Sequence, residues 1–265
     1  MTQERIQGRF GGKSVAVTGG GSGIGRATAI AFAGEGARVA VLDVNAEGAQ
    51  RTADAIGDGA AAIALNVASR ADWDQAMPAI QDAIGTLDVL VNCAGIGRAG
   101  RFEDLSDEDW QAQIDVNLTG TLLGCQQALQ AMAGRGGAIV NVASIYGLIG
   151  SDDTVGYNAT KGGVVLMTRS VALHCAKHQL NVRVNAVAPT YVDTEMLDPV
   201  AEAMGGRTTL TDGLGAMVPL GRVAQVSDIT PAILFLASHE AAMITGTVLP
   251  IDGGQTAGTF GGHAA

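Results

Sequence analysis

The stretch VAVTGGGSGIGRA, Val15 to Ala27, places a glycine-rich turn between an apolar run and a segment of helical periodicity. Glycines tolerate positive φ angles and let the backbone approach a ligand, while free N–H groups at a helix start favour anions. The turn does not follow G-x-G-x-x-G, because Ile24 stands where the third glycine would fall. It reads T-G-x-x-x-G-x-G, with Thr18, Gly19, Gly23 and Gly25. We interpret it as a binding turn for a dinucleotide diphosphate, the alternative being a plain strand–helix connection.

The next apolar run, RVAVLD, ends in Asp43, 20 residues after Gly23. A carboxylate in this place binds the hydroxyls of the adenosine ribose. Val44 follows Asp43 and Ser22 precedes Gly23, so neither position has a basic side chain for a 2′-phosphate. The sequence therefore predicts NAD rather than NADP as the cofactor.

Short apolar runs alternate with helical patterns along the whole chain. Continuous apolar runs suit strands that are buried on both faces, and the alternation is typical of βαβ units. We predict one doubly wound α/β domain of the Rossmann type over residues 1–265, with helices on both faces of a parallel sheet. The expected strands are 13–18, 38–43, 61–67, 87–92, 137–144, 181–189 and 246–254. The expected helices are 23–35, 69–84, 106–133, 154–178 and 227–237.

Marked residues follow several of these strands. They are Asn66, the segment Asn92–Gly95, Ser144 and the segment Ala188–Thr190. In open parallel sheets, ligands bind in the crevice outside the carboxyl ends of the strands. The clustering is what a dinucleotide site requires.

The charge balance and the cysteines exclude several classes of function. Sixteen Lys and Arg against 26 Asp and Glu give a net charge of −10, which disfavours nucleic acid and anionic membranes as partners. Cys93, Cys125 and Cys175 lack metal-ligand spacing, so we expect buried thiols in a reduced compartment and no metal. The polar start MTQERIQGRFGG and the lack of a long apolar run predict no membrane segment and a cytoplasmic location.

The octapeptide GYNATKGG, Gly156 to Gly163, puts Tyr157 and Lys161 four residues apart at a helix start. Such residues share a helix face, with Cβ atoms about 5–6 Å apart. Two unit charges about 4 Å apart interact by about 4 kcal/mol at an effective dielectric constant near 20, which equals roughly three pKa units. A lysine at that distance would lower the pKa of the tyrosine and make it an acid/base near pH 7. The alternative is a surface helix with a packed Tyr and a solvated Lys.

Taken together, TGGGSGIG, NCAG, Ser144 with Tyr157-Asn-Ala-Thr-Lys161, APT and IDGG resemble the motifs of the short-chain dehydrogenase/reductase family over nearly the whole chain. The resemblance implies a seven-stranded sheet and a homotetramer. It also implies a catalytic tetrad of Asn117, Ser144, Tyr157 and Lys161. In this tetrad Tyr157 exchanges the proton and Ser144 hydrogen-bonds the substrate oxygen. Lys161 binds the nicotinamide ribose and lowers the pKa of the tyrosine, and Asn117 holds a relay water from a long helix.

The sequence departs from the family pattern at three places. Asn66 replaces the usual acid after the third strand, Val91 replaces the first of two asparagines before Asn92, and Pro189-Thr190-Tyr191 replaces a Pro-Gly turn. None of these changes touches the tetrad. The expected cofactor-binding residues are Gly19, Ser22, Gly23, Ile24, Gly25, Asp43, Asn66, Val67, Asn92, Ala94, Gly95, Tyr157, Lys161, Pro189, Val192 and Thr194.

Residues 190–219 fit neither period and carry five acidic residues against one arginine, Arg207. We interpret this segment as a mobile substrate lid, with Met196, Met204 and Met217 as candidates for lining an apolar pocket. Its acidity disfavours a phosphorylated or carrier-bound substrate.

A small neutral secondary alcohol or its ketone is the favoured substrate. APTYVDTEM weakly resembles sugar-alcohol dehydrogenases of the family, which makes a polyol or sugar the leading choice. A 3-oxoacyl thioester, a hydroxysteroid and a cyclic ketone remain alternatives, as does a non-enzymatic redox sensor or scaffold. Asp152 and Asp153 are interpreted as a solvated loop rather than polyol ligands, and His174 and His178 as packing or surface residues.

Overall fold

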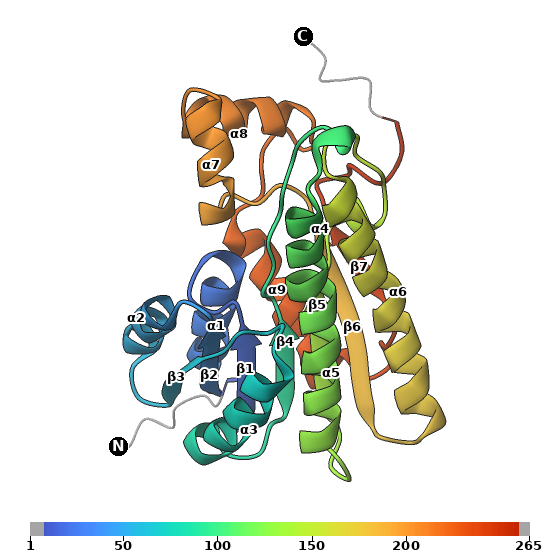
Figure 1. Cartoon of the computed structure of the whole chain (residues 1–265). Coiled ribbons are helices and arrows are strands. Elements are labelled where there is room, and N and C mark those ends of the chain that lie inside the picture. Colours follow the sequence, from blue (N-terminus) through green and yellow to red (C-terminus); the bar gives the residue numbers. More distant parts are fainter. Residues whose placement is uncertain (1–7, 260–265) are drawn as a thin grey trace.

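A computed structural model describes residues 8–259, which form a parallel sheet of seven strands with helices on both faces (Figure 1). The spatial order is β3-β2-β1-β4-β5-β6-β7. The strands are β1 (Ser14–Thr18), β2 (Arg38–Asp43), β3 (Ala60–Ala64), β4 (Val89–Asn92), β5 (Gly137–Val142), β6 (Val182–Pro189) and β7 (Val248–Ile251). The doubly wound fold and the seven strands are confirmed. From β1 the next strands extend the sheet in one direction, and from β4 onward they extend it in the other. A crevice for a ligand opens at such a switch point between β1 and β4.

Alternate residues of each central strand enter two separate cores, because successive side chains of a strand point to opposite faces. Val15 and Val17 pack with α1 (Gly23–Gly34), α2 (Ala46–Ile56) and α9 (Val226–Ala237). Ala16, between them, packs on the other face with α3 (Arg70–Ile84), α5 (Gly120–Ala131) and α6 (Val155–Lys177). The front layer of Figure 1 shows α3, α5 and α6 over the sheet.

The predicted helix 106–133 is wrong as a continuous α-helix. It divides into α4 (Asp107–Gln113), a π-helical segment η2 (Ile114–Thr119) and α5. A π-helical turn contains one extra residue, which shifts the side chains that follow it and is frequent at functional sites. The extra residue here lies in the segment that carries Asn117.

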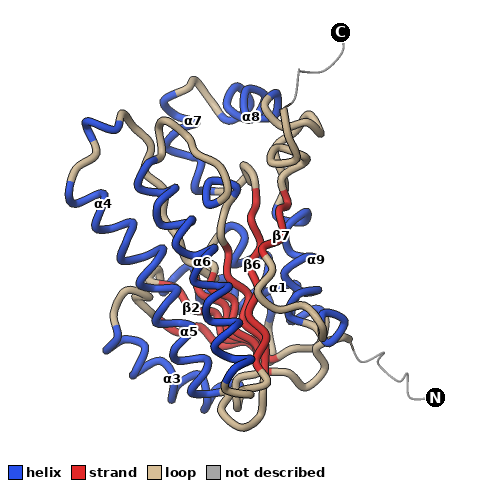
Figure 2. Tube along the Cα trace, turned by 90° about the vertical axis from the view of Figure 1, so that its right-hand side faces the viewer, coloured by secondary structure: helices blue, strands red, loops and turns tan. Residues whose placement is uncertain are grey.

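The lack of periodicity in the segment 190–219 suggested an irregular structure, but the segment is largely helical. It forms η4 (Glu195–Leu197), α7 (Asp198–Ala203) and α8 (Arg207–Ala216) above the carboxyl ends of the strands (Figures 1 and 2). These helices are too short to show a clear apolar period. Arg207 pairs with Asp193 and, at 2.8 Å, with Asp198, so part of the predicted acidity is neutralised within the segment. Short 3₁₀ turns complete the described chain: η1 (Phe102–Asp104), η3 (Ile145–Gly147) and η5 (His239–Ala241).

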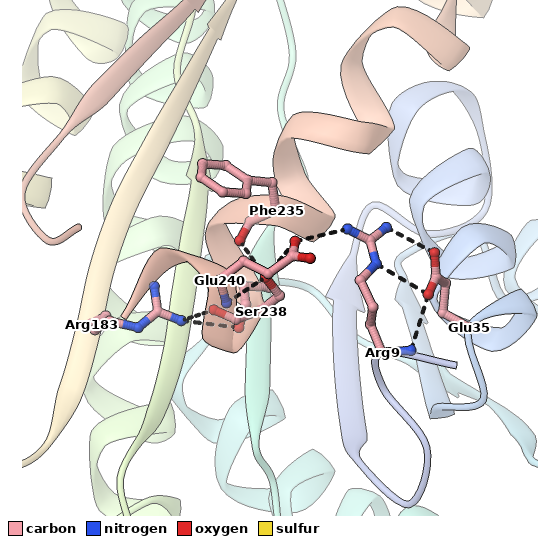
Figure 3. Close-up of polar contacts among 7 residues, drawn as sticks. Arg9, Glu35, Arg183, Phe235, Ser238 and Glu240 are labelled. Atoms are coloured by element: carbon pink, nitrogen blue, oxygen red, sulfur yellow. Dashed lines mark hydrogen bonds and ion pairs between the residues drawn. The ribbon is translucent and has the colours of Figure 1, made fainter. Parts of the chain in front are cut away.

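Two arginines make contacts near the amino ends of the strands, opposite the crevice (Figure 3). Arg9 donates to Glu35 at the end of α1 and reaches Glu240 at 3.4 Å. Arg183, at the start of β6, donates to three carbonyls at the end of α9, those of Leu236, Ala237 and Ser238. A guanidinium suits a helix C-terminus, whose carbonyl groups lack partners. These contacts stabilise the scaffold at the end of the sheet away from the crevice.

The expectation for the N-terminal stretch partly concerns residues 1–7, and these lie outside the described residues.

Candidate active site

The glycine-rich turn joins β1 to α1 at the switch point. Gly19 has φ +65° and packs so closely on the loop after β4 that a Cβ would lie 2.8 Å from Ala94 Cα. A Cβ on Gly25 would lie 2.0 Å from the Gly19 carbonyl oxygen. The hydroxyl of Thr18 accepts from the N–H groups of Cys93 and Ala94 at 3.0 and 3.1 Å. Side chains at Gly19 and Gly25 would collide with neighbouring backbone, so this close packing of the turn requires glycine.

Asp43 ends β2 at the edge of this turn. Its carboxylate accepts from the N–H of Gly21 and from the N–H of Asn45, both at 2.9 Å. These bonds hold the acid in one orientation. Val44 beside it is 76% exposed, which leaves an uncharged side chain at the place where a 2′-phosphate would need a base.

Ser144, Tyr157 and Lys161 come together on the same side of the crevice. Ser144 follows β5, whereas Tyr157 and Lys161 lie in the first two turns of α6. The Nζ of Lys161 lies 5.5 Å from the centre of the Tyr157 ring and donates to the Val142 carbonyl at 2.8 Å. Ser144 lies close enough to Tyr157 for its hydroxyl to act on the pKa of the phenol. An ammonium has three hydrogens, so Lys161 can bind further oxygen atoms at this site.

The expected lowering of the tyrosine pKa is wrong for the protein without a bound ligand. Burial raises the pKa of Tyr157 to about 12, although the nearby Ser144 hydroxyl acts in the opposite direction. Burial lowers the pKa of Lys161 to about 8. The low dielectric of the site disfavours both charged forms, and the ammonium points to Val142 rather than to the phenol oxygen.

Asn117 does not present its side chain to the cavity. Its Oδ1 accepts the N–H of Ile96 at 2.8 Å, and its Nδ2 donates to the Ile96 carbonyl at 2.9 Å and to Thr160 Oγ1 at 3.1 Å. Both amide hydrogens are therefore used. This side chain fixes the loop after β4 against α6, and the water-holding role stays a prediction.

A cavity of about 650 Å³ opens over the switch point and contains most of the predicted site. Fourteen of the sixteen expected cofactor residues line it; Gly25 and Asn92 do not. Gly25 packs against the Gly19 carbonyl inside the turn and not against the cavity. Asn92 is buried and donates to Asn141 at 2.9 Å, which in turn donates to Thr168 of α6 at 2.9 Å. Asn92 thus ties β4 to β5 from a buried position behind the cavity wall.

The segment 190–219 lines the cavity mainly with apolar side chains and with one acid. Met196 and Met217 line it as expected, whereas Met204 does not. Glu195 accepts from the Gly23 N–H at 3.1 Å and pairs with Arg26. A carboxylate thus lies at the N-terminus of α1, where the helix dipole favours an anion.

Sequence reasoning missed two tyrosines and underrated an acid. Tyr146 and Tyr191 line the cavity beside Ser144 and Tyr157, and Asp153 lines it while Asp152 does not. The hydroxyls of the two tyrosines are 2.5 Å apart. The position of Tyr191 after the sixth strand was a usable signal, but Tyr146 lies in a short turn without periodicity.

The cysteines and histidines have no evident part in the chemistry. Cys125 and Cys175 are buried and all three thiols are free, although Cys93 lines the cavity. His174 and His178 pack on each other with ring centres 4.4 Å apart. Within residues 8–259, no group of His, Cys, Asp and Glu is arranged to hold a metal ion. No helix among these residues is both long and apolar enough to cross a bilayer.

Comparisons with known proteins agree with this geometry. A family model described as enoyl-(acyl carrier protein) reductase matches residues 19–256. The chain is 42% identical to D-threitol dehydrogenase of Mycolicibacterium smegmatis, over 94% of each chain. It is 39% identical to sorbitol dehydrogenase of Cereibacter sphaeroides, over 93% of this chain and 98% of that one. The crystal structure of a short-chain type dehydrogenase/reductase from Mycobacterium marinum superposes with a TM-score of 0.86 at 33% identity, covering 94% of this chain and 97% of that one.

The chain belongs to the short-chain dehydrogenase/reductase family. It is an oxidoreductase that acts on CH–OH groups with a nicotinamide dinucleotide.

Proposed function

We propose that this protein is an NAD-dependent dehydrogenase of small neutral secondary alcohols, with a polyol or sugar as the favoured substrate. The observation that carries the proposal is one cavity that joins the glycine-rich turn and Asp43 to Ser144, Tyr157 and Lys161. The first two features suit the adenosine half of a dinucleotide, and the other three suit acid/base work on an alcohol.

The nicotinamide supplies the hydride chemistry, and the protein has to orient the carbinol and move one proton. During oxidation the phenolate of Tyr157 takes the hydroxyl proton, and during reduction the phenol returns it. Ser144 holds the reacting oxygen. Lys161 would bind the nicotinamide ribose through the ammonium hydrogens that its bond to the Val142 carbonyl leaves free. Asn117 acts as a positioning residue for the loop that carries Ile96.

Asp43 and Val44 support NAD over NADP. The orientation of Asp43 suits two ribose hydroxyls, and a 2′-phosphate would meet a like charge there. The basic side chains among the cavity-lining residues are Arg98 and Lys161. Arg98 lies on the loop after β4 and pairs with Asp109 at 3.0 Å, so neither base belongs to the Asp43 end.

Two observations bear on the substrate. Similarity to the threitol and sorbitol dehydrogenases supports a polyol. The apolar lining residues Leu210, Leu214 and Met217 support the alternative of a hydroxysteroid or cyclic ketone. Similarity to a 3-oxoacyl-(acyl-carrier-protein) reductase of Thermotoga maritima supports the alternative of a 3-oxoacyl thioester. Asp153 and Glu195 in the lining disfavour anionic substrates.

A substrate panel with NAD tests this proposal. We expect the highest kcat/KM for tetritols, pentitols or hexitols and a lower kcat/KM for monohydric secondary alcohols. A hydroxysteroid and a 3-hydroxyacyl thioester should give the lowest values. The absorbance of the reduced nicotinamide follows the reaction. A steroid or thioester at the top of the ranking would select the alternative function. Dinucleotide binding without turnover of any alcohol or ketone would indicate the redox sensor or scaffold.

The raised pKa of Tyr157 predicts the pH dependence of the two directions. A phenol with a pKa of about 12 is almost wholly protonated at neutral pH, and its phenolate fraction rises with pH. We therefore expect kcat for alcohol oxidation to rise from pH 7 to pH 9 and kcat for ketone reduction to stay nearly constant, because the phenol form remains in large excess. Steady-state rates in both directions in buffers of constant ionic strength check this. An oxidation rate that falls over the same range would contradict it.

Glu195 predicts an effect on cofactor affinity. Its carboxylate lies at the α1 N-terminus and pairs with Arg26, where it competes with the diphosphate for the same positive end of the helix. Charges at such a site are worth about 0.3–1 kcal/mol, so Glu195→Gln should lower the Kd for NAD roughly two- to fivefold. Calorimetric titration measures it, with Glu202→Gln, an exposed acid of α7, as the matched control. A weaker affinity in Glu195→Gln would show that Glu195 assists the cofactor.

Three features beyond the reaction belong to the same proposal. Residues 190–219 act as a lid that closes over cofactor and substrate, with Gly205 and Gly206 at positive φ between α7 and α8 as the hinge. The protein works in the cytoplasm as a homotetramer. Leu166 and Leu173 on α6 support association between copies, since they are 63% and 72% exposed.

A further inference from the structure

Two tyrosines from separate elements meet at the wall of the cavity. Tyr146 lies in η3, two residues after Ser144, and Tyr191 lies two residues after Pro189, the last residue of β6. Their hydroxyls are 2.5 Å apart and their rings meet edge to face, with centres 6.0 Å apart at 76°. Both side chains are half-buried and line the cavity.

The pair adjoins the reacting groups. The N–H of Tyr146 donates to the Ser144 hydroxyl at 3.2 Å. The phenol of Tyr146 is also near enough to Tyr157 to raise its pKa. An oxygen atom bound by the pair would therefore lie beside an oxygen atom held by Ser144 and Tyr157.

The two tyrosine hydroxyls have hydrogen-bonding groups without a partner in the described residues. Two phenols hold two hydrogens and four lone pairs, and the bond between them uses one hydrogen and one lone pair. Within residues 8–259, neither hydroxyl has another hydrogen-bond partner. One phenol hydrogen and a lone pair of the other phenol are thus left for a ligand in the cavity that both residues line. Burial and Tyr146 raise the pKa of Tyr191, which keeps this group neutral and able to donate.

We propose that Tyr146 and Tyr191 form a subsite for a second substrate hydroxyl, so that the enzyme selects vicinal diols over monohydric alcohols. A hydroxyl on the carbon next to the reacting carbinol accepts from the free phenol hydrogen and donates to the oxygen of the other phenol. A site built to bind a hydroxyl rejects an analogue that lacks it, because the polar groups of the site lose their partner. This inference rests on the proposed function and specifies its substrate class.

Phenylalanine variants test the subsite, because they keep the rings and remove the hydroxyls. We compare kcat/KM with NAD for 2,3-butanediol and for 2-butanol, which differ by one hydroxyl. Tyr146→Phe and Tyr191→Phe should each lower the diol-to-alcohol ratio about tenfold, mainly through KM for the diol. Because the hydroxyls act as a unit, the double variant should lose less than the product of the two single effects.

Thr190→Val is the matched control. It removes a cavity-lining hydroxyl beside Tyr191 that already donates to Gln255, so the ratio should stay unchanged. An unchanged ratio in both phenylalanine variants, with 2-butanol still oxidised, would overturn the subsite and leave the proposed function standing. Failure of the wild type to oxidise the diol would overturn the subsite, and failure with every alcohol of the substrate panel would overturn the proposed function as well. A ratio that falls equally in Thr190→Val would assign the effect to general polarity and also overturn the subsite.

Discussion

Tyr157→Phe is expected to abolish turnover and to leave dinucleotide binding almost unchanged. The substitution removes one oxygen atom and keeps the ring, so the wall of the cavity and the contact with Lys161 persist. General acid/base groups contribute roughly 10²- to 10⁴-fold, and we expect kcat to fall by that amount. Single-turnover rates and the Kd for NAD, measured on the same preparation, separate chemistry from binding.

A folding control separates loss of chemistry from loss of structure in the variant. A thermal unfolding midpoint near that of the wild type excludes a misfolded protein. A variant that retains most of its kcat would show that another group moves the proton. A large loss of NAD affinity with little loss of kcat would place Tyr157 in the cofactor site alone.

Asp43→Ser combined with Val44→Arg is expected to reverse the choice of cofactor. Hydrogen bonds to a charged group are worth about 1.5–3 kcal/mol each, and the substitution removes the carboxylate that would make two of them. It also removes a like charge from beside the 2′-phosphate and adds a base at an exposed position. We expect the ratio of kcat/KM for NAD to that for NADP to fall by roughly 10²-fold or more.

The single variant Val44→Arg provides the matched comparison. It adds the base while Asp43 still repels the phosphate, so its shift should be smaller than that of the double variant. Equal use of both cofactors by the wild type, or no shift in the double variant, would show that Asp43 does not face the ribose.

The strands and the site could be predicted because local chemistry fixes them. Continuous apolar runs identified the parallel strands, and the glycines around Gly19 located the turn. Tyr157 and Lys161 share a face of α6 as their spacing requires. All of these follow from backbone periodicity and from the common edge at which parallel strands end.

The remainder depends on tertiary packing. No sequence period marks the π-helical segment that breaks the helix at Asn117, because the Ile96 loop and Thr160 hold it. The pKa of Tyr157 depends mainly on burial, which is a property of the folded protein. Glu195 and the Tyr146–Tyr191 pair join residues from distant parts of the chain, and only the folded cavity brings them together.

Transfer of isotope from substrate to cofactor tests the central claim most directly, since the claim is hydride transfer between a carbinol carbon and nicotinamide. The enzyme is incubated with NAD and a polyol that carries deuterium on the carbinol carbons, and the reduced cofactor is analysed by mass spectrometry. We predict one deuterium atom per reduced nicotinamide, and no label from deuterated water. Reduced cofactor without the label, or no reduced cofactor with any polyol, would contradict it.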